Sequence, residues 1–189
     1  MNFKAIFSNK INLALLILVI LILILITNKK TNFMQATGAK KLPKDHKPDE
    51  VGIAHFKTWE GYRTKAYKDS AGLWTTGIGH LIRRPKEDHL IRKILTNAEV
   101  MDLFYADIKK AHNVVVSKIS VPISQGLYNA LLSLAYNTGT LYSSIVKLVL
   151  ADDMKGLKAR WKTTAITVNQ GKKRIQGLVN RRNSEIKLF

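Results

Sequence analysis

The chain of 189 residues contains no cysteine. Neither disulfides nor thiol-based regulation are therefore available, and the redox state of the compartment cannot be inferred from cysteine usage. Acidic residues are also scarce: 13 Asp and Glu stand against 31 Lys and Arg, giving a formal net charge of +18 and an isoelectric point near 10.1. This excess of positive charge indicates an anionic partner.

Residues 11–28 contain no charged residue, and residues 13–26 are all apolar. Eighteen helical residues rise about 27 Å, close to the ~30 Å hydrocarbon core of a bilayer. The stretch is almost entirely Leu and Ile, and the nearest small-residue cleavage option, residues 36–38, is remote. We therefore expect an uncleaved transmembrane signal anchor after a short basic N-terminus (residues 1–10), with a cleaved signal peptide as the alternative.

Residues 29–47 are polar, rich in lysine and without an apolar period, so they predict a flexible basic tether. The remaining residues, 48–189, are enough for one ordinary hydrophobic core, and no internal repeat is visible. Helical patterns dominate this part after Glu87, over residues 96–113, 124–136, 144–151, 153–163 and 178–188.

Two carboxylates and one hydroxyl follow each other at short intervals: Glu60, Asp69 and Thr75, directly before residues 77–80 (Gly-Ile-Gly-His). The apolar spacing predicts a helix that ends at Glu60, where unpaired carbonyls disfavour the charged carboxylate and keep a proton available. Residues 62–76 predict a hairpin with Asp69 at its turn and Thr75 on the returning strand. Two carboxyl groups in different environments can divide acid and base roles in glycoside hydrolysis.

The residues around these three positions carry a family resemblance. Residues 60–63 (Glu-Gly-Tyr-Arg), 67–69 (Tyr-Lys-Asp) and 75–80 (Thr-Thr-Gly-Ile-Gly-His) together resemble the active-site segment of phage-type lysozymes, glycoside hydrolase family 24. Where secreted members of that family often carry Cys at the middle catalytic position, this chain has Asp69. The resemblance covers about three quarters of the chain and includes residues 95–99, 136–139 and 177–182, with Trp161 and Glu185.

The resemblance implies hydrolysis of the β-1,4 bond between N-acetylmuramic acid and N-acetylglucosamine in peptidoglycan. Glu60 would be the general acid, Asp69 the base or the partner of the developing oxocarbenium ion, and Thr75 the residue that positions water. We favour inversion, which needs carboxyl groups about 6.5–9.5 Å apart. It further implies an α+β, lysozyme-like fold that is mostly helical, with a small β-hairpin beside the active-site cleft.

Five further residues are assigned from the same resemblance. Leu81, Tyr136 and Asn137 are candidate substrate-binding residues, although Tyr136 and Asn137 fit a helix end before Gly139 equally well. His80 is expected to be structural and paired with Asp107. No metal or other cofactor is expected.

The expected partners are peptidoglycan glycan strands, whose peptide carboxylates would attract a basic enzyme, and a membrane reached through the N-terminal helix. We expect a monomer with its catalytic domain on the periplasmic or extracellular side, or secreted if the anchor is cleaved. The lysines that flank residues 11–28 favour the opposite orientation.

A nucleic-acid-binding module and an inactive wall-binding module are the alternative functions. The basic residues match no nucleic-acid motif, which argues against the first, and the catalytic triad is intact, which argues against the second.

Overall fold

The structure is a computed structural model that describes residues 19, 39–69, 71–168 and 173–189. The chain divides into two units, Met1–Gly38 and Ala39–Phe189, and the second is described here. Within the described residues, no helix is both long and apolar enough to cross a membrane. The expected anchor, residues 11–28, lies outside the described residues except for Val19.

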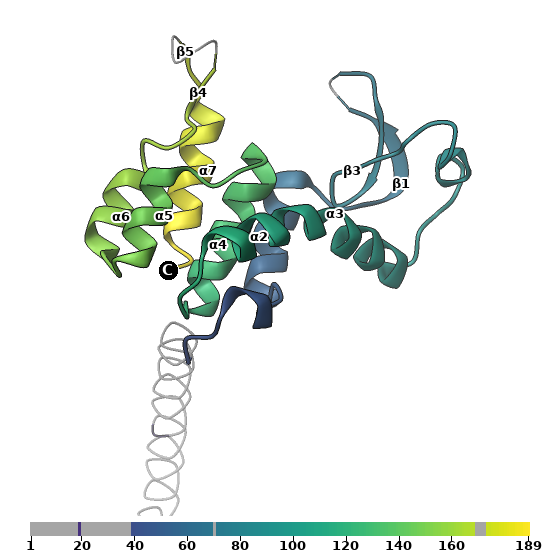
Figure 1. The fold of residues 1–189 in the computed structure, drawn as a ribbon. Coiled ribbons are helices and arrows are strands. Elements are labelled where there is room, and N and C mark those ends of the chain that lie inside the picture. Colours follow the sequence, from purple (N-terminus) through teal and green to yellow (C-terminus); the bar gives the residue numbers. More distant parts are fainter. Residues whose placement is uncertain (1–18, 20–38, 70, 169–172) are drawn as a thin grey trace, which may run out of the picture. The chain divides into compact units, whose positions relative to one another are not determined.

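The unit Ala39–Phe189 combines helices with two small antiparallel sheets, as the α+β prediction requires (Figure 1). In chain order the elements are η1 (Pro43–Asp45), α2 (Glu50–Glu60), β1 (Arg63–Lys68), β2 (Trp74–Gly77), β3 (His80–Leu81), η2 (Asp88–Leu90), α3 (Asn97–Lys118), α4 (Gln125–Thr138), α5 (Ser143–Leu150), α6 (Met154–Trp161), β4 (Thr167–Val168), β5 (Lys173–Arg174) and α7 (Gln176–Ile186).

Helix α2 ends at Glu60, which confirms the sequence prediction. The side chain of Asp49 accepts a hydrogen bond from the backbone N–H of Gly52 and caps the start of the helix. Gly61 follows the last turn with φ +81°, a conformation that favours glycine, and its N–H donates to the carbonyl of Lys57.

The first sheet has the order β1-β2-β3, and all of its pairs are antiparallel. The predicted hairpin is present as β1 and β2, whereas the third strand, β3, was not predicted. Strand β3 follows a tight turn at Gly77 and Gly79, whose φ angles are +62° and +70°. Thr75 lies between two partners in this sheet, Tyr67 on β1 and Leu81 on β3.

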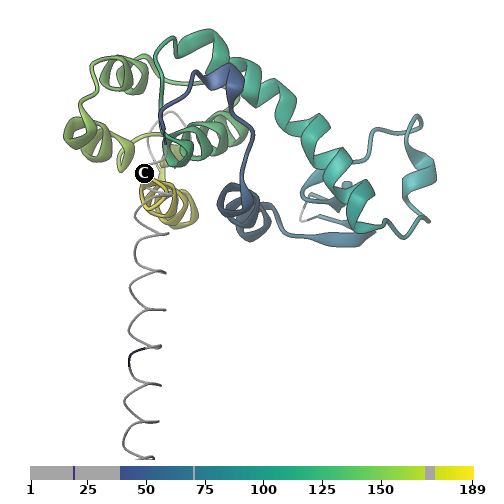
Figure 2. The same cartoon turned by 90° about the horizontal axis from the view of Figure 1, so that it is seen from below.

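Helix α3 runs from this sheet to the remaining helices, and Figure 2 shows the same arrangement from below. It starts with the predicted capping box, in which Thr96 and Glu99 each bond the other's backbone. It ends at Lys118 rather than near residue 113, because Val115 extends its buried stripe by a turn. Helix α4 is the centre of the core, with every residue from 127 to 135 buried.

Two parts of the fold differ from the expectation. A second hairpin, β4 and β5, precedes α7 where one hairpin in total was predicted. Residues 39–47, expected to belong to the tether, lie against the folded unit instead: Lys41 exchanges two backbone hydrogen bonds with Ile123, and Pro43 and His46 are buried. The folded unit therefore begins near Ala39, because these two side chains provide buried surface that the lysine-rich composition concealed.

Candidate active site

Glu60 occupies the last position of α2, and its side chain is about one-fifth exposed. Its Oε1 lies 2.7 Å from Nη1 of Arg181, a buried residue of α7. The backbone of Gly79 packs against it from the sheet, since a Cβ at Gly79 would lie 3.0 Å from the Cβ of Glu60. The position of the Glu60 side chain is therefore restricted by the end of α2, by the guanidinium of Arg181 and by the turn at Gly79.

Asp69 lies at the turn between β1 and β2, and the loop orients its carboxylate. Its Oδ1 accepts hydrogen bonds from the backbone N–H groups of Ala71 and Leu73, both at 2.9 Å. Its Oδ2 has no hydrogen-bond partner among the residues that the structure describes. One carboxylate oxygen is thus used for positioning, and the other is available to a water molecule or a sugar.

Thr75 is buried in the middle strand, and its hydroxyl lies at a long 3.5 Å from the carbonyl of Leu73. A hydroxyl held this weakly keeps its capacity to bond a water molecule. Leu81, its neighbour on β3, is 48% exposed and presents an apolar surface beside it.

The structure brings His80 and Asp107 together, with 2.8 Å between Nδ1 and Oδ2. The hydrogen bond with Asp107 raises the pKa of His80 above its ordinary value; burial opposes the rise, and the charges of Asp107 and Glu87 add to it. Since His80 is 3% exposed and joins β3 to α3, the pair is a structural link between sheet and helix.

Tyr136 and Asn137 lie in the last turn of α4, before Gly139 with φ +74°. Tyr136 packs edge-on against Phe56, with ring centroids 5.4 Å apart. Asn137 accepts a hydrogen bond from Arg182 at 2.9 Å through its Oδ1. Both residues therefore contribute to packing around the end of α4.

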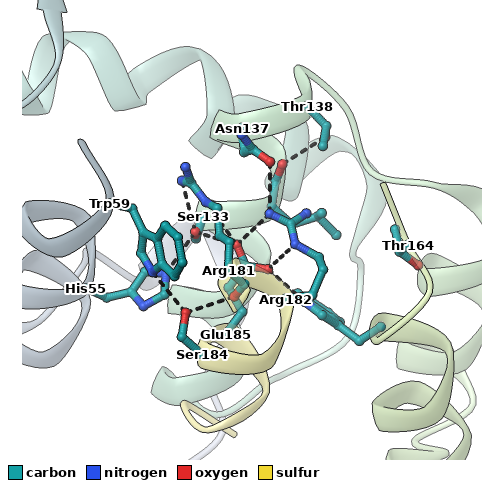
Figure 3. Close-up of polar contacts among 12 residues, drawn as sticks. His55, Trp59, Ser133, Asn137, Thr138, Thr164, Arg181, Arg182, Ser184 and Glu185 are labelled. Carbon is teal, nitrogen blue, oxygen red and sulfur yellow. Dashed lines mark hydrogen bonds and ion pairs between the residues drawn. The ribbon is translucent and has the colours of Figure 1, made fainter. Parts of the chain in front are cut away.

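Arg181 also belongs to a buried polar network that connects α2, α4 and α7 (Figure 3). Arg181 donates to Oγ of Ser133, which itself donates to Oε1 of Glu185 at 2.7 Å. Arg182 approaches both carboxylate oxygens of Glu185, and the indole N–H of Trp161 donates to Oε2 at 2.9 Å. Arg181 and Arg182 thus share the fully buried carboxylate of Glu185, and Arg181 also contacts Glu60.

His55 on α2 completes this network, with Nε2 3.1 Å from Oγ of Ser133. Burial, together with the positive charges of Arg181 and Arg182, lowers the pKa of His55 to about 4. The ring is therefore neutral at pH 7. Because the hydroxyl proton of Ser133 points to Glu185, His55 must donate from Nε2.

Sequence reasoning missed Arg181 as a neighbour of the first carboxylate. Its position within residues 177–182 was noted, but no local pattern reveals which distant side chain an arginine will meet. Among the described residues, no group of three or more His, Cys, Asp or Glu side chains has an arrangement suited to a metal ion.

Comparison with known proteins agrees with this architecture. A family model described as phage lysozyme matches residues 57–185. An endolysin of Acyrthosiphon pisum secondary endosymbiont phage 1 is 32% identical over 144 residues, covering 74% of this chain and 95% of that protein. A SAR-endolysin of Pseudomonas phage phiKMV is 29% identical, covering 72% and 84%. The solved endolysin from Escherichia coli O157:H7 phage FAHEc1 has a TM-score of 0.64 and 29% identity, covering 76% and 93%.

Proposed function

The chain belongs to the phage lysozyme family and is a peptidoglycan-hydrolysing glycoside hydrolase, and from this premise we propose that Glu60, Asp69 and Thr75 carry out the cleavage. The bond cleaved is the β-1,4 linkage between N-acetylmuramic acid and N-acetylglucosamine. The main support is the placement of the two carboxyl groups: Glu60 ends α2 beside Arg181, and Asp69 is held at the hairpin turn by two backbone N–H groups.

Glu60 protonates the oxygen of the departing sugar. Its contact with Arg181 and the close approach of Gly79 limit its side chain to one region. A fixed position is what a general acid needs, since proton transfer requires heavy atoms about 2.6–3.2 Å apart. We assign Arg181 as a positioning residue, because it acts through Glu60.

Asp69 removes a proton from the attacking water, and Thr75 holds that water. The two backbone N–H groups that fix Oδ1 leave Oδ2 for this task. The weakly bonded hydroxyl of Thr75 supplies a second contact to the water. Leu81, Tyr136 and Asn137 are proposed to contact the substrate, although part of Asn137 is engaged by Arg182.

The stereochemistry of the first product tests these roles. If Asp69 activates a water, the first product from a defined muropeptide oligomer is the α-anomer, because water attacks the face opposite the departing β-linked sugar. NMR of fresh product measures the anomer directly. A β-anomer would eliminate the inverting mechanism.

A substitution tests the position of the water. Thr75→Glu places a carboxylate where the water is proposed to lie, and a trapped sugar–protein adduct is the expected result.

We also propose that residues 11–28 anchor the enzyme in the membrane, with the catalytic domain on the periplasmic or extracellular side. The similarity to a SAR-endolysin and the uncharged stretch support this localisation. Membrane fractionation with N-terminal sequencing tests it: full-length protein in the membrane fraction is expected, and a shortened soluble protein would show cleavage. That the enzyme is a monomer without a nucleic-acid partner stays a prediction.

A further inference from the structure

A cavity of about 430 Å³ lies away from the candidate active site, between residues 44–48, α3 and α4. Pro48, at its edge, precedes the start of α2, whereas Glu60 ends that helix. Eleven helical residues span about 16 Å, so the cavity and the catalytic acid lie at opposite ends of α2. None of the residues assigned to catalysis lines the cavity.

The floor of this cavity is apolar and rigid. Ile108 and Tyr128 are 4% and 1% exposed, and Pro48 is buried beside them. The ring of Tyr128 stacks on His46 at 5.0 Å with 16° between the planes, and its hydroxyl lies 2.9 Å from Nδ1 of His112. Side chains held in this way cannot collapse into the cavity, which is therefore preformed.

The rim of the cavity is positively charged. Lys44, Lys47 and Lys109 all line it and are exposed, and no Asp or Glu is among the lining residues. None of the three lysines forms an ion pair with a residue that the structure describes, in contrast to Lys40 and Lys93, which pair with Asp152 and Glu99. The rim is therefore free to bind an anion.

We propose that this cavity is an accessory binding site for the acidic stem peptides of peptidoglycan. Three lysine ammonium groups suit a ligand with several separated carboxylates, and the apolar floor suits the methyl groups of alanine. The proposal rests on the proposed function, because the polymer that the enzyme cleaves carries such peptides. The site holds a peptide while the glycan strand occupies the catalytic carboxylates.

Direct binding is tested with the full chain in detergent micelles. The probe is the free tetrapeptide L-Ala-γ-D-Glu-diaminopimelate-D-Ala, which contains no glycosidic bond and so reports binding independently of cleavage. Calorimetric titration is expected to show binding that weakens about tenfold or more in the triple variant Lys44→Gln, Lys47→Gln and Lys109→Gln, if each lost pair contributes as a strong surface pair does.

A matched triple variant controls for net charge. Lys118, Lys147 and Lys155 are exposed lysines elsewhere on the unit that do not line the cavity, and replacing them with Gln removes the same three charges. The control variant is expected to bind the tetrapeptide as the parent does. Equal weakening in both variants would overturn the proposal in favour of a general charge effect.

Two further probes distinguish other anions. Inorganic phosphate that binds as tightly as the tetrapeptide would overturn recognition of a peptide. Vesicles containing phosphatidylglycerol test a lipid headgroup: if the cavity variant loses vesicle binding relative to the control variant and keeps tetrapeptide binding, the site belongs to a membrane surface and the proposal fails.

Kinetics separate the accessory site from the catalytic one. On peptide-bearing glycan strands the cavity variant is expected to show a KM raised several-fold with kcat unchanged, and on strands stripped of their peptides no change in either. An equal change on both substrates would contradict the proposal. Inactivity of the parent on both substrates would instead contradict the proposed catalytic function, while the tetrapeptide titration would still report on the cavity.

Discussion

At the scale of single residues, the contact between Glu60 and Arg181 links the catalytic role that we propose for Glu60 to the stability of the fold. The guanidinium lies 2.7 Å from the carboxylate and is itself buried. A change at Glu60 therefore has two effects, because it removes a proton donor and leaves a buried cation with one partner fewer.

Glu60→Gln is expected to lower wall-lytic activity at least ~10²-fold, the lower edge of what general acid–base catalysis contributes. Turbidity loss of bacterial cell walls measures the activity, and circular dichroism shows whether the variant is folded. Glu50→Gln, at the exposed first turn of the same helix, is the control and should stay active. A folded Glu60→Gln protein as active as the parent would contradict the assignment.

His80 gives a prediction about pH. Because its pKa is raised in the folded state, the stability that it contributes is fully present below the unfolded pKa of 6.5 and is lost as pH rises through the folded pKa. Asp107→Asn should thus cost about 1.5–3 kcal/mol of unfolding free energy at pH 5, as for a hydrogen bond to a charged group, and much less at pH 9.

Denaturant unfolding of the parent and of Asp107→Asn across this pH range gives the free-energy difference, and an NMR titration gives the pKa of His80 itself. A normal or lowered pKa would count against the hydrogen bond as its cause. A stability loss that does not vary with pH would mean that Asp107 acts only through packing.

At the scale of elements, α7 is held to α4 and α6 by a buried ionic network more than by an apolar stripe. Four of its residues are buried, and three of them are charged: Arg181, Arg182 and Glu185, beside Val179. Burial raises the pKa of Glu185, and the charge of Arg182 and the donors Ser133 and Trp161 oppose that rise. The helix therefore depends on the pairing of these charges.

Glu185→Gln is expected to destabilise the protein by roughly 3–5 kcal/mol, because it leaves the buried Arg182 without its counter-charge. Asp152→Asn breaks an ion pair with Lys40 that is exposed on both sides, and it should cost less than about 1 kcal/mol. Urea unfolding of the two variants compares them. Equal losses would show that the buried network does not fix α7.

At the scale of the whole molecule, the charge of +18 on a chain with 13 acidic residues makes association with an anionic wall depend on salt. The screening length falls from ~10 Å at 0.1 M salt to ~3 Å at 1 M. We expect kcat/KM on intact walls to fall about tenfold over this range, as the loss of electrostatic steering predicts.

Glycan strands stripped of their peptides keep the scissile bond but carry fewer carboxylates; they are the control substrate, and their hydrolysis should depend less on salt. Turbidity loss should slow but persist at 1 M salt, since cleavage does not depend on steering. A complete loss of wall activity that the control substrate does not share would mean that binding, and not cleavage, had produced the turbidity change.

Local signals were sufficient for several parts of this protein. The end of α2 at Glu60, the capping box at Thr96 and the hairpin that carries Thr75 depend on residues that are close together in the sequence. Helix caps, apolar periods and turn residues act over that range, so the sequence determines them by itself. The catalytic roles that we propose come from the family resemblance.

Contacts between distant residues needed the tertiary structure. Arg181 meets Glu60 across 121 positions of sequence, and Lys41 pairs with Ile123. His80 and Asp107 were expected from the resemblance and not from their spacing. The cavity between residues 44–48, α3 and α4 has no signature in any one segment. The sequence alone determined the main helices and the first hairpin, because their signals are local. Only the tertiary structure added β3 and the second hairpin and decided which charges meet and where a cavity stays open, because these depend on packing between distant segments.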